Sequence, residues 1–463
     1  MGTETAHMTE FKEQGGPSTM DPPAHKRWIA SQMLTSWVSF SGTDKRRIKQ
    51  EKERVNQKLP HHVEYFHFVD DPYSHLTAQI LETFSARYNI KLTCYLVSKP
   101  PGDNAPEFEL LMNLARYDAY MIADKYGLSF EDRKEAPKQD VIDIAQSILA
   151  AQDDQSFISC VAEVSHAMWS GDKEELLELS NKFGSASSKE VSEVVARGDA
   201  RRAELKHYSG AMLYYAGEWY WGIDRLYHLE KRLSSLGVDQ FPSTELIAPR
   251  PEILSGPLKD SGSLTLEIFP TLRSPYSAIA FDRAVALAEE TGVNLSVRLV
   301  LPMVMRGVPT TTIKGHYIFW DTGREARAAG IPFGKIYDPV GDPVRRCCSL
   351  IPWAETQGKH IELIRAFYQC AFVKGINTNN NRGLRKVVEN AGLSWQEAKK
   401  RIGDPEGAKM LERNRLALLD AGIWGTPSFR LLDSNGAQIL ALWGQDRLWR
   451  VADEIQQQLT KMI

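Results

Sequence analysis

Short apolar runs alternate with longer amphipathic stretches along the second half of the chain. An apolar run at 264–269 precedes a stretch that starts at Pro275, and a second apolar run follows at 293–301. Within the amphipathic stretch, apolar residues recur at the spacing of one helix face, namely Phe281, Ala284, Val285 and Ala288. Strand, helix and strand in this order predict a parallel βαβ unit with a right-handed crossover.

The remainder of this half predicts a helical insertion, a hairpin and a last helix. Helical patterns interrupted by Gly and Pro run from about residue 312 to 419. The segments SFRLLD and QILALWG flank a turn at 434–436, which is typical of a β-hairpin. The last helix has one apolar face, formed by Leu448, Val451, Ile455 and Leu459. The predicted order is therefore βαβ, helical insertion, ββα, in an α/β fold.

Three blocks of the first half recur in the same order in the second half. The blocks are DPYS at 71–74 with SPYS at 274–277, YGLSF at 126–130 with AGIPF at 329–333, and WGIDR at 221–225 with WGQDR at 443–447. Asp118 and Asp321 share the offset of the first two blocks, 203 positions. These matches indicate an internal duplication and predict two tandem domains.

Composition marks the segments outside the repeat. The first 24 or so residues are rich in Gly, Pro, Ser, Thr and charge, which favours a mobile tail. The stretch from Lys26 to Gln57 is typical of a helical arm with a solvated charged end. A Pro- and Ser-rich stretch has the composition of a linker. The predicted organisation is a tail and arm at 1–60, a degenerate first copy of the repeated domain at 61–240, a linker at 241–263 and the second copy at 264–463.

Charge and cysteine content restrict the function classes. The 463 residues include 56 Lys and Arg against 59 Asp and Glu, and a net charge of −3 gives no broad field for nucleic acid or anionic lipid. The five cysteines lack CxxC spacing, which argues against a disulfide framework and a dithiol redox pair. We see no metal-binding spacing of His and Cys and no phosphate loop. No signal-like or membrane-spanning apolar stretch occurs, so we expect a cytoplasmic protein.

The motifs of the second half occur together in one known group of proteins. With SPYS at the start of the first helix, Gly425-Thr426-Pro427 before the third strand and WGQDR before the last helix, the chain resembles the 2-hydroxychromene-2-carboxylate isomerase and kappa-class glutathione transferase branch of the DsbA-like thioredoxin superfamily. The resemblance covers 264–460 and extends more weakly over 63–236. It implies two tandem thioredoxin-like domains and glutathione as the cofactor.

The resemblance also implies which residues would bind glutathione. Ser274 stands where DsbA-like proteins carry their CxxC pair, and its hydroxyl would stabilise the glutathione thiolate at a helix N-terminus, unless it serves only as an N-cap. Ser277 is a candidate second donor. Thr426 and Pro427 match the cis-proline loop, whose backbone would pair with a peptide-like ligand, unless Pro427 lies in an ordinary turn.

Further candidates follow from the WGQDR motif and from the loop after the second strand. In the family, the carboxylate that matches Asp446 binds the γ-glutamyl ammonium, a role compatible with N-capping, and Gln445 would add a hydrogen bond. Met305, Arg306 and Lys314 are candidate substrate contacts at the rim. Either cation would pair with a substrate carboxylate, and a solvated surface charge is the alternative for both.

Some residues depart from the family pattern. Arg273 precedes the serine where an apolar residue is usual, and Thr271 replaces an acidic one. In the first half, Asp71 occupies the serine position, where a carboxylate would repel a thiolate. Alignment places Met212 at the position of the cis-proline. We therefore expect that the first half lacks thiol chemistry.

The leading hypothesis is a glutathione-dependent isomerase or transferase acting on a small conjugated or aromatic molecule. Ser274 would be its catalytic residue. A thiol-disulfide oxidoreductase of DsbA type and a non-catalytic thioredoxin-fold binding protein are the alternatives. The duplication leaves a homodimer open as the oligomeric state.

Overall fold

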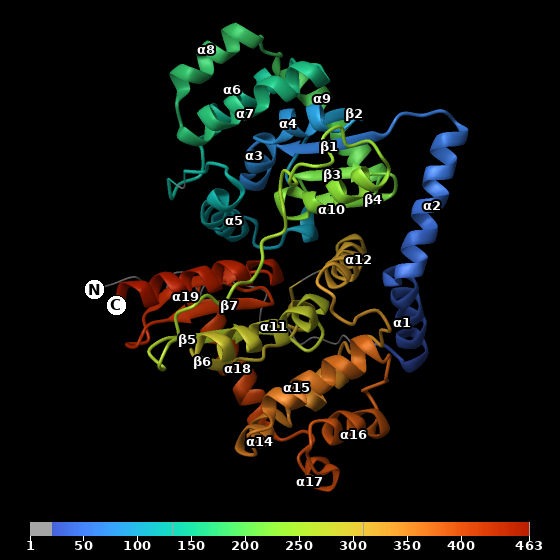
Figure 1. The fold of residues 1–463 in the computed structure, drawn as a ribbon, viewed down its shortest axis with the longest axis vertical. Coiled ribbons are helices and arrows are strands. Elements are labelled where there is room, and N and C mark those ends of the chain that lie inside the picture. The colour runs from blue at the N-terminus through green and yellow to red at the C-terminus, as the bar shows by residue number, and fades with distance from the viewer. Residues whose placement is uncertain (1–20, 132, 309, 463) are drawn as a thin grey trace. The chain divides into compact units, whose positions relative to one another are not determined.

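The computed structural model describes residues 21–131, 133–308 and 310–462, which form two compact units (Figure 1). One unit, here the C-terminal unit, combines the described residues up to Asp44 with those from Glu252 onward. The other, the N-terminal unit, is Lys45–Pro251. Most of the predicted tail lies outside the described residues. The predicted arm is helical but breaks at Ser39, giving α1 (Ala24–Val38) and α2 (Phe40–Asn56).

The N-terminal unit contains a four-stranded sheet and a large helical insertion. Its elements after α2 are β1 (His62–Phe68), α3 (Pro72–Ala78), α4 (Leu81–Arg87), β2 (Lys91–Val97), α5 (Phe108–Ala123), α6 (Gln139–Ala150), α7 (Asp154–Ser170), α8 (Lys173–Phe183), α9 (Ser188–Glu204), β3 (Met212–Tyr215), β4 (Glu218–Trp221) and α10 (Gly222–Ser235). Short 3₁₀ turns η2 (Gly102–Asn104) and η3 (Asp124–Tyr126) flank α5.

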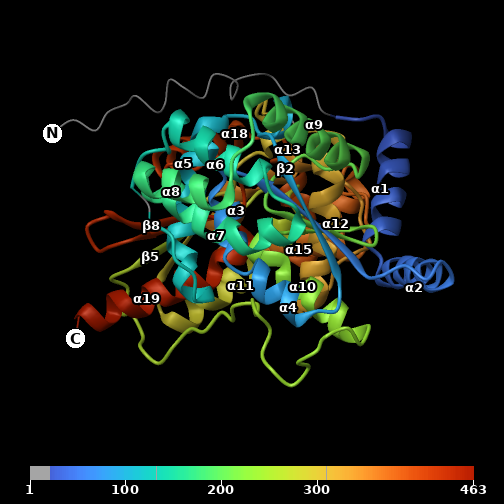
Figure 2. The same ribbon diagram turned by 90° about the horizontal axis from the view of Figure 1, so that it is seen from above.

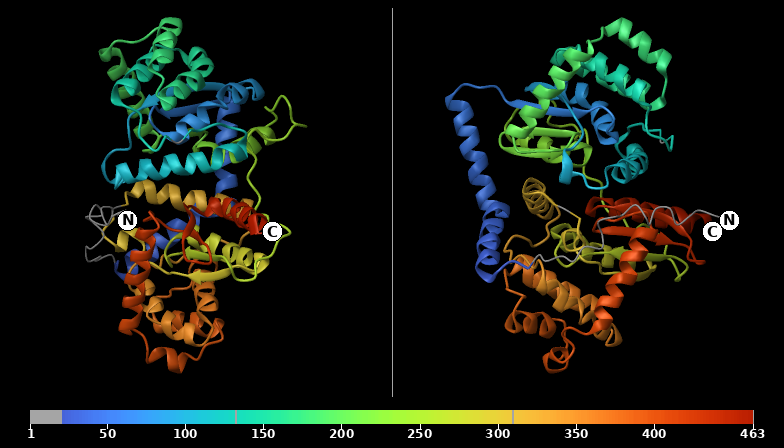
Figure 3. Two further views of the ribbon diagram at one scale, coloured as in Figure 1. Left: turned by 90° about the vertical axis from the view of Figure 1, so that its left-hand side faces the viewer. Right: turned by 180° about the vertical axis from the view of Figure 1, so that it is seen from behind.

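The C-terminal unit repeats this plan. It contains β5 (Thr265–Phe269), α11 (Pro275–Thr291), β6 (Asn294–Val297), η4 (Met303–Met305), α12 (Thr312–Ala328), α13 (Asp342–Cys348), α14 (Ile351–Thr356), α15 (His360–Tyr368), η5 (Gln369–Val373), α16 (Asn381–Asn390), α17 (Trp395–Lys399), α18 (Pro405–Asp420), β7 (Ser428–Leu432), β8 (Gln438–Trp443), η6 (Gln445–Arg447) and α19 (Leu448–Met462). The helices α14 to α17, orange in Figure 3, gather at one end of this unit. Figure 2 shows α19, in red, leading to the C-terminal end.

The two sheets have the same strand order and directions. The orders are β2-β1-β3-β4 and β6-β5-β7-β8. In each sheet the first pair is parallel and the other two pairs are antiparallel. The predicted α/β fold class, with βαβ, a helical insertion and ββα in each half, is therefore confirmed. The strand predicted at 293–301 is shorter, because regular pairing with β5 ends at Val297, although Val300 N–H still reaches the Pro270 carbonyl.

The apolar faces predicted from the sequence form the core of the C-terminal unit. The four residues expected to share a face of α19 are at most 6% exposed. At the end of β5, Phe269 packs in a buried cluster with Val300, Ile423 and Ala441. This apolar cluster supports the edge of the sheet at which the candidate site lies.

A shared set of hydrogen bonds links the motifs within each unit. Tyr73 donates to the Asp118 carboxylate at 2.8 Å, and Tyr276 donates to Asp321 at 2.7 Å. The matched serine of each motif accepts a hydrogen bond from the backbone N–H six residues earlier, at 3.2 Å in both units. The motif residues recognised as repeated in sequence thus make equivalent contacts. In the part of the chain that the structure describes, no helix has the length and apolarity needed to cross a membrane.

Candidate functional site

The candidate residues of the C-terminal unit meet at one edge of its sheet because of the strand register. Phe269, the last residue of β5, pairs with Ser428, the first of β7, and Ser428 pairs with Trp443, the last of β8. The chain segments that leave β5, enter β7 and leave β8 therefore lie next to one another. They carry Ser274, Thr426 and Asp446.

Ser274 begins α11, and both predicted roles of this residue fit the geometry. Its hydroxyl oxygen accepts a hydrogen bond from Ser277 N–H at 3.2 Å, so it caps the helix. Pro275 follows at the first helical position, where the missing N–H costs nothing. The side chain is partly exposed and donates no hydrogen bond to any described residue. The hydroxyl proton can therefore reach a ligand at the positive end of a 17-residue helix.

The loop before β7 has the form that the resemblance implies. The Thr426–Pro427 peptide bond is cis. Ser428 Oγ donates to the Gly425 carbonyl at 3.0 Å, and Gly444 N–H donates to the Pro427 carbonyl at 3.0 Å. Only glycine fits at 425, because a Cβ there would lie 1.7 Å from the Trp443 ring. Thr426 itself makes no backbone hydrogen bond to the described residues, which leaves its N–H and C=O available to a ligand.

Asp446 lies at the same edge, in the 3₁₀ turn η6 that leads into α19. Its side chain is 23% exposed, and Oδ1 is 3.5 Å from Nη1 of Arg447. The carboxylate can therefore accept an ammonium group from solvent while it remains close to a buried guanidinium. The neighbouring Gln445 is different, because its amide accepts from Arg283 at 3.1 Å and donates to Glu325 at 2.9 Å. Gln445 is buried and joins α11, α12 and η6, so we correct its predicted role as a ligand contact.

Ser277 also has a structural role. It is fully buried, and its hydroxyl accepts the Thr271 N–H hydrogen bond that closes the turn between β5 and α11. Tyr368 of α15 donates to the carbonyl of the same Thr271 at 3.1 Å. A ligand cannot contact the Ser277 hydroxyl in this conformation. The prediction of a second donor is therefore wrong, because the third residue after an N-cap faces the core here.

Two of the three predicted substrate contacts lie inside the unit. Met305 and Arg306 are each 3% exposed. Arg306 donates to the carbonyls of Leu301 at 3.0 Å and Trp424 at 2.5 Å, so it joins the loop after β6 to the loop before β7. Burial, with a smaller contribution from the Arg415 charge, lowers the pKa of Arg306 to about 10, and it stays charged at neutral pH. The prediction that Arg306 is a rim charge is wrong.

Lys314 remains a candidate contact. It lies in the first turn of α12, where its N–H is capped by Thr311 at 3.2 Å. Burial of the ammonium lowers the pKa of Lys314 to about 8. A lysine with such a pKa gives up its proton more readily than a solvated lysine does.

The structure adds one ion pair that sequence reasoning did not anticipate. The Arg273 guanidinium donates Nε and Nη2 to the two carboxylate oxygens of Asp338, at 3.1 and 3.2 Å. Arg273 was recognised as a departure from the family, but its partner is 65 positions away and has no motif around it. Arg273, one member of this pair, directly precedes Ser274 in the sequence.

Residues 265–456 match the family model of the DSBA-like thioredoxin domain. The C-terminal unit carries a DsbA-like thioredoxin domain. Solved structures similar to the chain include a 2-hydroxychromene-2-carboxylate isomerase, at 16% identity, 43% coverage of this chain, 97% of that chain and a TM-score of 0.36. The cytosolic disulfide reductase DsbM from Pseudomonas aeruginosa gives 20% identity, coverages of 42% and 99% and a TM-score of 0.35. A probable DsbA oxidoreductase from Streptomyces coelicolor is 18% identical, with 42% of this chain and 90% of that chain covered and a TM-score of 0.33. No curated protein sequence matches the chain.

None of the five cysteines belongs to the segment 271–277 that leads into α11 in the DsbA-like domain. None of them forms a disulfide; four are buried, and Cys94 is partly exposed. Burial raises the pKa of Cys348 to about 12 and that of Cys160 to about 11. These thiols are therefore protonated at neutral pH and are poor nucleophiles. Among the described residues, no group of three His, Cys, Asp or Glu side chains is arranged to hold a metal ion.

The N-terminal unit carries a different set of groups at the equivalent edge. Asp71 caps α3, accepting from Tyr73 N–H, Ser74 N–H and the Ser74 hydroxyl at 3.3, 3.1 and 2.9 Å. Burial raises the pKa of Asp71 to about 7, against the opposing effect of these hydrogen bonds. A carboxyl group thus replaces the serine hydroxyl of the DsbA-like domain. No thiolate would be stabilised there.

The position equivalent to the cis-proline is Ala211 and not Met212. Met212 pairs with Phe66 and Trp221, as Ser428 pairs with Phe269 and Trp443. The Ala211 carbonyl also accepts the Gly222 N–H, matching the bond from Gly444 to Pro427. Unlike proline, Ala211 has an N–H, and it donates this group to Ser74 Oγ at 2.9 Å. The alignment was wrong by one residue because loop lengths between the matched blocks differ.

Proposed function

We propose that the DsbA-like domain is a glutathione-dependent enzyme, an isomerase or transferase, in which Ser274 stabilises the glutathione thiolate. The proposal follows from the chemistry of the sheet edge. It presents a hydroxyl donor at a helix N-terminus, a backbone N–H and C=O pair without a backbone partner and a partly exposed carboxylate. A γ-glutamyl thiol peptide has a sulfur, a peptide backbone and an ammonium group to match them.

The observation that carries the proposal is the state of Ser274. Its oxygen is held in place by the Ser277 N–H, while its proton has no acceptor among the described residues. A hydroxyl in this state at the start of α11 can donate to an anionic sulfur, and the helix N-terminus stabilises the same charge. Both effects lower the pKa of a bound thiol.

The remaining edge residues would orient the peptide. The backbone of Thr426 would pair with glutathione as an added strand does, because neither group is used within the described chain. The Asp446 carboxylate would accept the γ-glutamyl ammonium in a charge-assisted hydrogen bond. The sulfur would thereby be placed at Ser274.

The bound thiolate would act as a nucleophile on a conjugated, electron-poor alkene. Its sulfur forms a bond to the β-carbon, and the π electrons move to the conjugated carbonyl oxygen as an enolate. In an isomerase, rotation about the resulting single bond precedes elimination, which restores the alkene and the thiolate. In a transferase, the enolate takes a proton and the conjugate is released. The thiolate is a catalyst in the first case and a substrate in the second.

A thiol-disulfide oxidoreductase is disfavoured by the same edge. Disulfide exchange needs a thiolate from the protein. The start of α11 carries two serines instead, and the thiols of the chain are elsewhere. We expect no turnover in an insulin-reduction assay, and robust turnover would favour the oxidoreductase.

Calorimetric titration with reduced glutathione tests the proposal. We expect one site, with affinity about tenfold weaker in Asp446→Ala, since one charge-assisted bond contributes roughly 1.5 kcal/mol. We expect Ser274→Ala to lower turnover of a conjugated substrate about 100-fold, as the loss of one oxyanion donor does.

Two matched changes control for indirect effects. Ser394→Ala removes the N-cap of another helix in the same unit, α17, and Asp420→Ala removes an exposed carboxylate paired with Arg430. Neither should alter glutathione affinity. No binding at millimolar glutathione would remove glutathione as the ligand, and equal losses in the controls would remove Ser274 and Asp446 from the site.

A further inference from the structure

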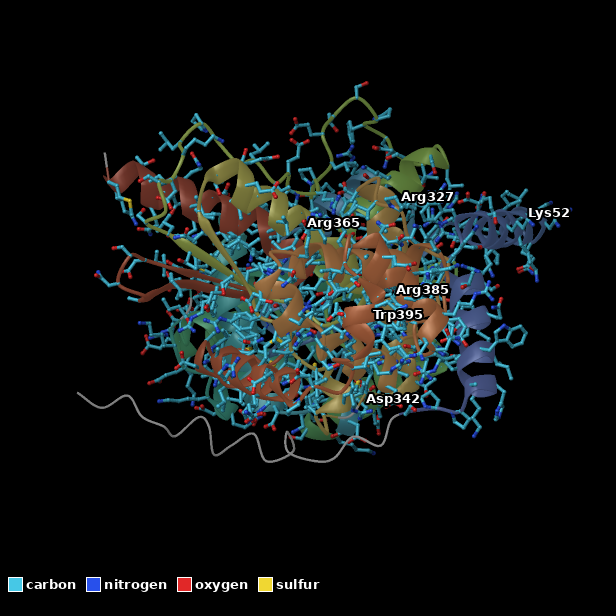
Figure 4. The ribbon with its side chains drawn as sticks, turned by 90° about the horizontal axis from the view of Figure 1, so that it is seen from below. Lys52, Arg327, Asp342, Arg365, Arg385 and Trp395 are labelled. Atoms are coloured by element: carbon cyan, nitrogen blue, oxygen red, sulfur yellow. The ribbon has the colours of Figure 1, made fainter. Side chains whose placement is uncertain are left out.

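Helix α1 of the arm packs on the C-terminal unit through one face. Its buried residues are Arg27, Ser31, Leu34 and Val38, spaced as successive turns of a helix. Val38 packs against Gly323 of α12, and a Cβ added at Gly323 would lie 3.1 Å from the Val38 Cβ. Further along the arm, at the start of α2, Arg327 of α12, labelled in Figure 4, pairs with Asp44 at 2.8 Å and lies 5.0 Å from the Phe40 ring.

The polar residues of this face hold an extended segment, 336–340. Thr35 Oγ1 accepts from Ile336 N–H at 3.0 Å, and Ser31 Oγ accepts from Asp338 N–H at 3.0 Å. Arg27 donates to the carbonyls of Asp338, at 3.0 Å, and Val340. Three side chains about one helical turn apart thus bind alternate residues of the segment. Because Arg27 is 1% exposed and Ser31 is fully buried, these bonds do not exchange readily with water.

The same segment holds the residue next to Ser274. The Asp338 carboxylate binds Arg273 through two hydrogen bonds and also accepts the Val340 N–H at 3.1 Å. A continuous set of contacts therefore runs from α1 through Asp338 to Arg273. An unpaired guanidinium at this position would attract any anion to the start of α11.

We propose that α1 is a positioning element of the C-terminal site: it fixes Asp338 against Arg273 and so neutralises the cation beside Ser274. The edge then stabilises an anion through the Ser274 hydroxyl and the helix N-terminus and not through a full positive charge. Applied to a glutathione thiolate, this inference rests on the proposed function. The electrostatic part concerns the protein alone.

Other charged groups around the start of α11 are paired with one another. They are Asp321 with Arg324 on α12, Asp282 on α11 with Arg365 on α15, and Asp446 with Arg447 on η6. Arg283 on α11 and Glu325 on α12 are instead joined through the neutral amide of Gln445. Lys314 on α12 and Arg306 after η4 are two further cations of this unit. Changes at 273 and 338 leave all of these groups in place.

The test uses Ser274→Cys in the full chain, which places a thiol at the start of α11 and requires no glutathione. The pKa of the introduced thiol is measured from the pH dependence of its alkylation by iodoacetamide, with the parent chain as background. The native thiols interfere little, because four are buried and burial raises the pKa of Cys94 well above its usual value.

We expect opposite shifts from the two members of the pair. Asp338→Asn should lower the pKa of the thiol by roughly one unit, because the Arg273 cation loses its neutralising partner. Arg273→Gln should raise it by about the same amount, because the Asp338 carboxylate keeps its charge. Asp338→Asn combined with Arg273→Gln should give a thiol pKa close to that of Ser274→Cys alone. Shifts in the same direction, or no shift, would overturn the proposal, since a merely structural role gives no opposite signs.

The role of α1 is tested by Ser31→Ala combined with Thr35→Ala, which removes its hydroxyl contacts to 336–338. We expect a fall in the thiol pKa of about half a unit, in the direction of Asp338→Asn. Ser36→Ala, on the exposed face of α1, is the matched control and should change nothing. Equal thiol pKa values in the double variant and the control would remove α1 from the site.

Amide hydrogen exchange provides a second measurement with the native serine. With Ser31→Ala and Thr35→Ala combined, exchange of the Asp338 amide should be about tenfold faster than with Ser36→Ala. The loss of one hydrogen bond costs about 1 kcal/mol or slightly more. Unchanged exchange would also overturn the role of α1. Neither measurement involves glutathione. A failure to bind glutathione would therefore contradict the proposed function, while the thiol pKa and the amide exchange would still decide whether α1 positions Asp338.

Discussion

A buried guanidinium needs acceptors for its N–H groups, and Arg306 finds them in the carbonyls of Leu301 and Trp424. These carbonyls belong to the loops that follow β6 and precede β7. Trp424 is followed directly by Gly425-Thr426-Pro427. Arg306 therefore fixes the cis-proline loop from behind and is a positioning residue.

We expect Arg306→Gln to lower the free energy of unfolding by about 3 kcal/mol, because buried carbonyls lose charged donors. Arg306→Lys should recover only part of this loss, since an ammonium lacks the planar fork that reaches both carbonyls. Urea denaturation measures both changes. Arg385→Gln, at an exposed pair with Glu389 (Figure 4), is the control and should cost less than about 0.5 kcal/mol. Equal stability of the Arg306 and Arg385 variants would contradict this role.

Two glycines of the DsbA-like domain differ in how closely other elements approach them. The turn before β7 passes against the Trp443 ring, and a Cβ at Gly425 would overlap that ring. Gly315 in α12 differs, since a Cβ there would meet nothing within 4 Å. One glycine is required by packing, while the other only lowers helix stability.

Gly425→Ala should destabilise the domain by about 2 kcal/mol, a typical cost of overpacking, and should displace Trp443. Thermal denaturation and tryptophan fluorescence measure the two effects. Gly315→Ala should instead stabilise by roughly 0.5 to 1 kcal/mol, because alanine favours the helix. If Gly425→Ala were as stable as the parent, the close approach of the turn to β8 would be wrong.

At the scale of the whole molecule, the N-terminal unit contains several buried groups whose shifted pKa values make its stability depend on pH. Burial lowers the pKa of His67, His75 and His207 to about 3. The unfolded chain binds protons at these residues below about pH 6.5, so stability is lost as the pH falls. Asp71 acts in the opposite sense. Its folded pKa of about 7 lies above its usual value, so it contributes stability as the pH falls through 7.

We expect the N-terminal unit to lose stability between pH 6 and 4.5, because three histidines outweigh one aspartate. Each group changes the free energy of unfolding by at most roughly 1.4 kcal/mol per pH unit. Hydrogen exchange resolved by peptide, corrected for intrinsic rates, would detect the loss in residues 45–251. Asp71→Asn should make the fall steeper, since the opposing contribution is removed. A shallower fall in that variant, or none in the parent, would contradict these pKa directions.

The sequence by itself determined the elements and their order. Apolar spacing located α11 and α19, because helix faces are set by residues three and four positions apart. Ser274-Pro275 located the start of α11, because a capping hydroxyl and a proline act on their own backbone. The repeated motifs identified two equivalent sheets, and SPYS, GTP and WGQDR indicated a shared edge.

Tertiary structure alone decided which side chains of that edge reach solvent and which hold it together. Ser277, Gln445 and Arg306 have site-like positions in sequence, yet their polar groups are used by distant backbone or side chains. The ion pair joins Arg273 to Asp338, and α1 binds the segment that contains Asp338. These contacts join residues up to 313 positions apart. No local pattern encodes such contacts, because they depend on where chain folding places an acceptor in space.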